Sequence, residues 1–124
     1  QFKILIVEDD PAINSLYVMK LQRDGYEVEM AKDGETGWQL ATEKPFDLIL
    51  LDILMPKVDG YAMLEKLKRS KKTKSIPVII FSNLSQEEEI EKGLKLGAKD
   101  FIIKTSVTPS DLSRKVKYYI KNRS

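Results

Sequence analysis

Four short apolar runs in this chain each end at a polar residue of a different chemical kind. The runs are rich in Ile, Val and Leu and are separated by segments long enough to form helices. Runs of this composition indicate parallel strands that are buried on both faces. The runs and the residues that follow them are 4–7 with Glu8, Asp9 and Asp10, 48–51 with Asp52, 78–81 with Ser82, and 101–103 with Lys104.

The segments between these runs have helix signals, so strands and helices alternate along the chain. Asp10 before Pro11, and Thr108 before Pro109, predict helix starts. Residues 26–30 alternate apolar and charged side chains, which predicts a half-exposed strand at a sheet edge. The alternation predicts an α/β fold of the (βα)5 type, a doubly wound sandwich whose five parallel strands have the order 2-1-3-4-5, with helices on both faces. We expect a single domain over residues 1–124.

Apolar residues at helical spacing indicate which side of each predicted helix is buried. A loop marked by Pro56 precedes the third helix, and Gly97 is expected to end the fourth. We call the residues expected on the buried side of a helix its stripe. The predicted stripes are Gly60, Met63, Leu64 and Leu67 on the third helix, Leu84, Ile90 and Leu94 on the fourth, and Leu112, Val116 and Ile120 on the last.

Composition excludes several classes of site and partner. The chain of 124 residues contains no Cys and no His, which removes disulfides, imidazole bases and most zinc or copper sites. The net charge of +2 is too small to argue for a nucleic-acid or membrane surface. No apolar stretch approaches the ~20 residues of a membrane span, and no export signal is present, so we expect a cytoplasmic protein. The start at Gln1 without Met suggests either a trimmed chain or an excised domain.

The expected strand order brings acidic side chains together at one edge of the sheet. The first and third strands are neighbours, so Glu8 and Asp9 should approach Asp52. Crowded carboxylates raise each other's pKa unless a cation is present, and oxygen ligands without His or Cys favour Mg²⁺. We expect Asp9 and Asp52 as direct ligands and Glu8 as a ligand bound directly or through water. The backbone carbonyl of Leu54 would complete the set. The alternative is that the acidic residues only cap the helices that follow them.

The same edge contains the groups that phosphoryl transfer requires. A carboxylate can accept a phosphoryl group as an acyl phosphate, and Asp52 is our candidate nucleophile. Ser82 offers a hydroxyl and Lys104 a point charge to the transferring oxygens. The alternative for Lys104 is a solvated residue at the end of a strand.

Three stretches of the sequence resemble the receiver domain of bacterial two-component response regulators, and the resemblance covers essentially the whole chain. They are ILIVEDD at 4–10, DLILLDILMP at 47–56 with Asp59 and Gly60, and GAKDFIIK at 97–104. By this resemblance the site residues are Asp52 as phosphoacceptor, Glu8 and Asp9 as the metal-binding acid pair, Leu54 as the carbonyl donor, Ser82 as the switch hydroxyl, Phe101 as the switch aromatic and Lys104 as the phosphate-pairing lysine.

The resemblance also implies a mechanism and a set of partners. A sensor histidine kinase or a histidine phosphotransfer protein would donate the phosphoryl group, and the domain would catalyse only its own phosphorylation and dephosphorylation. Ser82 would then move toward the phosphoryl oxygens and Phe101 would turn inward. The face formed by the fourth helix, the fifth strand and the fifth helix would change shape and is our expected homodimer surface. For Phe101 the alternative is ordinary core packing.

Two positions depart from the family pattern. Thr105 stands where the family usually has a proline after a cis peptide bond. A trans bond at this position would change the direction in which the Lys104 side chain points. Asn83 stands where the family usually has a small residue, and we expect its side chain to narrow the path to Asp52. These departures favour the main rival, a pseudo-receiver that binds partners without phosphorylation.

Other functions receive less support from the sequence. A magnesium-dependent acylphosphate phosphatase would need a positioned acid or base. A flavin carrier would need a phosphate cradle where the first loop is acidic. The basic cluster at residues 66–74 is expected to be a solvated surface, without a nucleic-acid contact by this domain.

Overall fold

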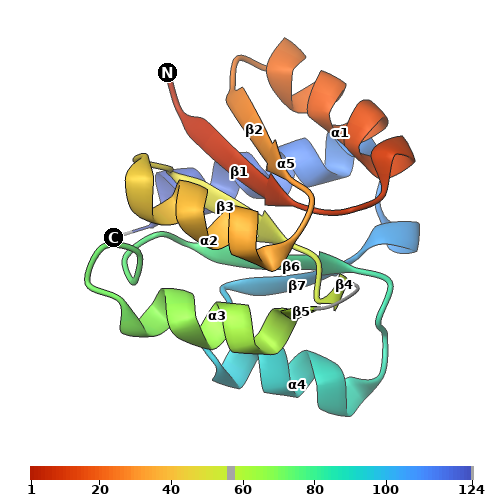
Figure 1. Ribbon diagram of the computed structural model, residues 1–124. Helices are drawn as coiled ribbons and strands as arrows, with labels where there is room; N and C mark the ends of the chain where they lie inside the picture. Colours follow the sequence, from red (N-terminus) through yellow and green to blue (C-terminus); the bar gives the residue numbers. More distant parts are fainter. Residues whose placement is uncertain (56–57, 124) are drawn as a thin grey trace.

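Strands and helices alternate along the chain as the sequence predicts (Figure 1). The computed structural model describes residues 1–55 and 58–123, so the predicted loop position Pro56 lies outside the described residues. The elements are β1 (Lys3–Val7), α1 (Pro11–Arg23), β2 (Glu27–Ala31), α2 (Gly34–Glu43), β3 (Leu48–Leu51), β4 (Leu54–Met55), β5 (Val58–Asp59), α3 (Gly60–Arg69), β6 (Val78–Ser82), α4 (Glu87–Lys95), β7 (Asp100–Ile103), the 3₁₀ helix η1 (Lys104–Ser106) and α5 (Pro109–Lys121).

Five parallel strands form the main sheet in the order β2-β1-β3-β6-β7. This is the predicted order 2-1-3-4-5, with β6 and β7 as its fourth and fifth strands. The predicted edge strand is confirmed, because β2 lies at one side of the sheet. The antiparallel pair β4–β5 is an addition, since the sequence predicts only a loop there.

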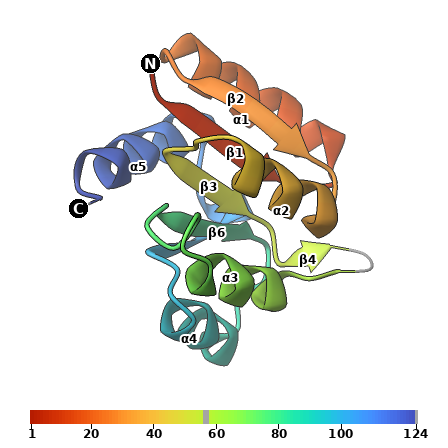
Figure 2. The same ribbon diagram turned by 60° about the vertical axis from the view of Figure 1, so that its left-hand side comes forward.

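Helices cover both faces of the sheet, with α1 and α5 on one face and α2, α3 and α4 on the other (Figures 1 and 2). Side chains of a strand point alternately to its two faces, so both faces of β1 are buried. Ile4 and Ile6 pack with the α1–α5 layer, and Leu5 and Val7 pack with the opposite layer. The predicted stripes of α3 and α5 are confirmed as buried.

The predicted stripe of the fourth helix is wrong in part. Leu84 lies in the loop before α4, which begins only at Glu87, and Leu94 is 44% exposed. The helix instead turns Gly93 toward the sheet, where a Cβ would overlap the end of the Ile80 side chain and closely approach the Phe101 ring. A glycine at this position allows α4 to lie close to β6 and β7.

No helix among residues 1–55 and 58–123 is both long enough and apolar enough to span a bilayer.

The start of α3 packs directly against the backbone that follows Asp52. A Cβ on Gly60 would overlap the Cα of Ile53, which is backbone and cannot turn away. A Cβ on Gly37, in α2, would instead meet the ends of two side chains, with 2.8 Å to Val7 Cγ2 and 3.0 Å to Met63 Cε. Gly60 therefore sets the distance between α3 and the residues next to Asp52.

This difference predicts unequal effects of two helical substitutions. Gly60→Ala should lower the free energy of unfolding by about 2–3 kcal/mol, because overpacking against backbone forces the loop to shift. Gly37→Ala should cost less than about 1 kcal/mol, because side-chain ends can move and alanine favours a helix. Urea unfolding of both variants and of the native protein measures these free energies of unfolding. Equal losses in the two variants would contradict the prediction.

Candidate functional site

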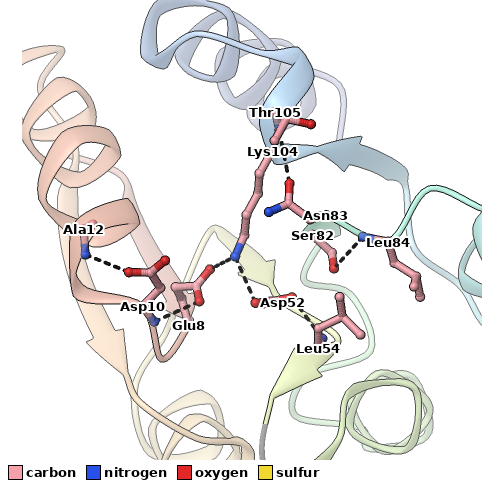
Figure 3. Close-up of polar contacts among 10 residues, drawn as sticks. All are labelled: Glu8, Asp10, Ala12, Asp52, Leu54, Ser82, Asn83, Leu84, Lys104 and Thr105. Carbon is pink, nitrogen blue, oxygen red and sulfur yellow. Dashed lines mark hydrogen bonds and ion pairs between the residues drawn. The ribbon is translucent and has the colours of Figure 1, made fainter.

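The carboxyl ends of four neighbouring strands place the candidate residues at one edge of the sheet (Figure 3). Val7 and Leu51 are paired at the ends of β1 and β3, so Glu8 and Asp52 leave these strands side by side. Ser82 is paired with Ile103 at the ends of β6 and β7. Parallel pairing therefore gathers residues that lie far apart in the sequence.

Three acidic side chains form a cluster at this edge. Carboxylate oxygens of Glu8, Asp9 and Asp52 all lie within 4.8 Å of one another. Glu8 and Asp52 are only 1% and 4% exposed, whereas Asp9 is exposed. The predicted convergence is confirmed, and the cluster meets solvent at Asp9.

Lys104 crosses the edge of the sheet to reach two of these acids (Figure 3). Its Nζ donates to Asp52 Oδ2 at 2.9 Å and also to Glu8 Oε1. The side chain is buried, with 7% of the residue exposed, so the alternative of a solvated lysine is wrong. The ammonium thus connects the ends of β1 and β3 to the residue that follows β7.

One buried ammonium faces two buried carboxylates, and burial and hydrogen bonding shift the pKa values of Glu8 and Lys104. Burial raises the pKa of Glu8 to about 7, although the hydrogen bond from Lys104 acts in the opposite direction. Burial alone would lower the pKa of Lys104, but its hydrogen bonds to Glu8 and Asp52 hold that pKa above its usual value. A divalent cation would supply the missing charge.

Backbone N–H groups fix the orientation of both buried carboxylates. The Asp10 N–H donates to Glu8 Oε2 at 3.0 Å, and the Leu54 N–H donates to Asp52 Oδ1 at 2.9 Å. Each carboxylate therefore uses one oxygen for the backbone and the other for Lys104. Asp10 caps α1 as predicted, accepting from the Ala12 N–H at 2.9 Å.

The residues expected to act as the switch lie on β6 and β7: Ser82 ends β6 at the edge that bears the cluster, and Phe101 lies within β7. Ser82 is fully buried, and its Oγ accepts a hydrogen bond from the Leu84 N–H at 3.3 Å. Phe101 is half-buried and packs against the core on the α2–α4 side of the sheet. The structure is compatible with both its predicted roles, so the switch function of Ser82 and Phe101 stays a prediction, as does the metal-binding role of the Leu54 carbonyl.

Sequence reasoning missed one contact at the rim of the site. Asn83 Oδ1 accepts a hydrogen bond from the Thr105 N–H at 3.2 Å (Figure 3). The described residues contain no cis peptide bond, so the bond before Thr105 is trans, and Lys104 still reaches Asp52. A contact between a side chain and backbone of two separate loops produces no periodic signal in the sequence.

The donor atoms suit a hard divalent cation. Magnesium takes oxygen ligands and commonly uses one or two carboxylates, with water and substrate oxygens completing an octahedron. Glu8, Asp9 and Asp52 offer only oxygens, one from the solvent side and two from the buried side. The residues present therefore fit Mg²⁺.

Comparisons with known proteins identify a family that matches most of the chain. A family model described as response regulator receiver domain matches residues 4–117. The DNA-binding dual master transcriptional regulator RpaA of Synechocystis is 41% identical over 102 residues, which cover 82% of this chain and 42% of the regulator. The alkaline phosphatase synthesis regulator PhoP of Bacillus subtilis is 38% identical, with 96% of this chain and 48% of that protein covered. The chain spans less than half the length of these relatives.

Solved structures show the same architecture. A response regulator receiver domain protein from Methanospirillum hungatei has a TM-score of 0.91 and 32% identity, covering 98% of this chain and 95% of that one. The receiver domain of sensor histidine kinase PA1611 from Pseudomonas aeruginosa has a TM-score of 0.87 and 26% identity, covering 97% and 98%. That structure has a magnesium ion coordinated in its active-site cleft.

The buried charge cluster predicts how the protein responds to loss of its ammonium. Lys104→Met should lower the free energy of unfolding by about 3 kcal/mol without metal, because buried carboxylates lose their compensating charge. Added Mg²⁺ should restore more stability to this variant than to the native protein. Urea unfolding with and without Mg²⁺ tests both statements. Lys115→Met, which removes a half-exposed lysine paired with Asp100, is the matched control, and equal losses in the two variants would contradict the cluster's importance.

Proposed function

The chain belongs to the response regulator receiver domain family, and from that premise we propose that it accepts a phosphoryl group on Asp52 in a magnesium-dependent reaction. The observation that carries the proposal is the position of the Asp52 carboxylate, which accepts a hydrogen bond from the Lys104 ammonium and lies within 4.8 Å of oxygens of the acid pair Glu8 and Asp9. The receiver domain would comprise residues 1–124 as a single unit.

Glu8, Asp9 and Asp52 would hold Mg²⁺ together with the backbone carbonyl of Leu54. The ion, when bound, would screen the charge of the incoming phosphoryl group. The Leu54 N–H holds one Asp52 oxygen in place, which limits the rotation of the nucleophile.

In the transfer itself, an Asp52 oxygen forms a bond to phosphorus while the bond between phosphorus and the donor nitrogen breaks. Lys104 pairs with the oxygens of the transferring group and stabilises their charge. The domain would act on its own Asp52 rather than on a separate substrate.

Ser82 and Phe101 would transmit phosphorylation to the surface. The Ser82 hydroxyl would leave its contact with the Leu84 N–H and turn toward the phosphoryl oxygens. Phe101 lies in β7, with its ring close to Gly93 of α4, and would follow inward. The face of α4, β7 and α5 would change shape, and a homodimer through this face is part of the proposal.

The donor would be a phosphohistidine of a sensor histidine kinase or of a histidine phosphotransfer protein, because this chain has no His. Such an exchange would take place in the cytoplasm. Relatives include a transcriptional regulator and a receiver domain of a sensor histidine kinase. We propose neither a membrane contact nor a nucleic-acid contact for the domain itself.

The pseudo-receiver remains the second candidate because Asn83 and Thr105 depart from the family pattern. A domain that never received a phosphoryl group would need neither a buried Asp52 nor the ammonium that compensates its charge at 2.9 Å. That contact favours the phosphorylated receiver.

The proposal predicts uptake of phosphate from a small donor. Incubation with acetyl phosphate and Mg²⁺ should add one phosphoryl mass to the intact protein, and chelation of Mg²⁺ should prevent the gain. Asp52→Asn should abolish the gain. Asp10→Asn should preserve it, because Asp10 is an exposed helix cap at the same edge.

Intact-mass spectrometry distinguishes the alternatives. No gain in the native protein at any Mg²⁺ concentration would support the pseudo-receiver. Rapid consumption of acetyl phosphate without accumulation on the protein would support a phosphatase.

The switch predicts separate roles for Asp52 and Ser82. Ser82→Ala should still become phosphorylated, but phosphorylation should no longer change amide hydrogen exchange in α4, β7 and α5, because the hydroxyl that follows the phosphoryl group is missing. Exchange measured by mass spectrometry in both states provides the comparison. Equal responses in the native and Ser82→Ala proteins would refute this role for Ser82.

A further inference from the structure

The loop that follows β6 and the 3₁₀ helix η1 that follows β7 are connected by a side chain. Ser82 and Ile103 are the last paired residues of these strands, and Asn83 and Lys104 come directly after them. Asn83 Oδ1 accepts from the Thr105 N–H at 3.2 Å (Figure 3). The Asn83 side chain thus adds a hydrogen bond between the segments after β6 and β7, just beyond the last backbone pairing of the two strands.

The Thr105 N–H has a structural reason to need this acceptor. Thr105 lies in the short helix η1, and N–H groups at the start of a helix have no partner within it. Asn83 supplies one from the neighbouring loop. A proline at 105 would have no N–H to donate, so an asparagine at 83 and a non-proline residue at 105 form a matched pair.

The position of the backbone at 104–105 determines where Lys104 points. The Lys104 side chain extends from this backbone to the buried carboxylates, and only 7% of the residue is exposed. We propose that Asn83 is a positioning residue for phosphoryl transfer: by holding the Thr105 amide, it aims the Lys104 ammonium at the reacting oxygens of Asp52. This inference rests on the proposed function of Asp52 as phosphoacceptor.

The expectation that Asn83 narrows the path to Asp52 predicts a different outcome. An obstacle should slow phosphorylation, and its removal should speed the reaction whatever residue stands at 105. A positioning residue should speed phosphorylation, and its effect should require the N–H at 105 and the ammonium at 104.

A double-mutant cycle separates these roles. Asn83→Ala is combined with Thr105→Ala, which retains the backbone N–H, and with Thr105→Pro, which removes it. Phosphorylation by acetyl phosphate and Mg²⁺ is followed by intact mass. Asn83→Ala should slow phosphorylation about fivefold, the effect of one ordinary hydrogen bond, in the native and Thr105→Ala backgrounds and have no effect in the Thr105→Pro background.

The same substitution in a Lys104→Met background tests whether Asn83 acts through Lys104. No further slowing supports the proposal. An equal effect of Asn83→Ala in every background, or faster phosphorylation in all of them, overturns it.

Amide exchange tests the contact without relying on phosphorylation. By NMR, the Thr105 N–H of the unphosphorylated protein should exchange about fivefold faster in Asn83→Ala than in the native protein, because its acceptor is lost. Unchanged exchange overturns the contact on which the proposal depends. If exchange accelerates while even the native protein takes up no phosphate, the contact stands but its role in phosphoryl transfer is overturned together with the proposed function.

Discussion

A lysine ammonium buried between two carboxylates is the interaction on which the rest of this site depends. Removing charges from water is costly, and the cost is recovered only where partners and hydrogen bonds are well placed. Lys104 meets this condition because Glu8 and Asp52 each direct one oxygen to it and the other to a backbone N–H. The parallel sheet makes the arrangement possible, since the ends of β1, β3 and β7 lie at one edge.

This cluster also supports the proposal that the site binds a cation and then accepts a phosphoryl group. A single ammonium cannot neutralise two buried acids and the neighbouring Asp9, and the raised pKa of Glu8 is one consequence of burying so much negative charge. A divalent ion would correct the balance on the solvent side. Lys104 would then be available to the oxygens of a group that arrives on Asp52, without moving to another part of the molecule.

The sequence was sufficient to predict the main sheet and the convergence of its functional residues. Strands buried on both faces produce continuous apolar runs, and the polar residue that ends each run lies at the carboxyl edge. Sequence alone could not determine that Glu8 is buried while Asp9 is exposed, because either acid can follow a strand that ends at Val7. That difference depends on which carboxylate Lys104 reaches across the sheet.

The elements that were missed are those that produce no periodic pattern. The strands β4 and β5 contain two residues each, too few to show alternation. Leu84 fits the helical spacing of Ile90 and Leu94 but lies in the loop before α4. Three apolar residues at helical spacing do not reveal at which residue a helix begins. The contact between Asn83 and Thr105 joins two loops through one side chain and becomes visible only when the strands are paired.

A crystal structure of the protein grown with Mg²⁺ would show whether the acid cluster holds the ion. We predict an ion about 2.1 Å from carboxylate oxygens of Asp9 and Asp52, the usual distance for magnesium. We also predict that the Lys104 ammonium remains in contact with Asp52. An ion bound elsewhere, or a Lys104 side chain that leaves Asp52 for solvent, would contradict this prediction.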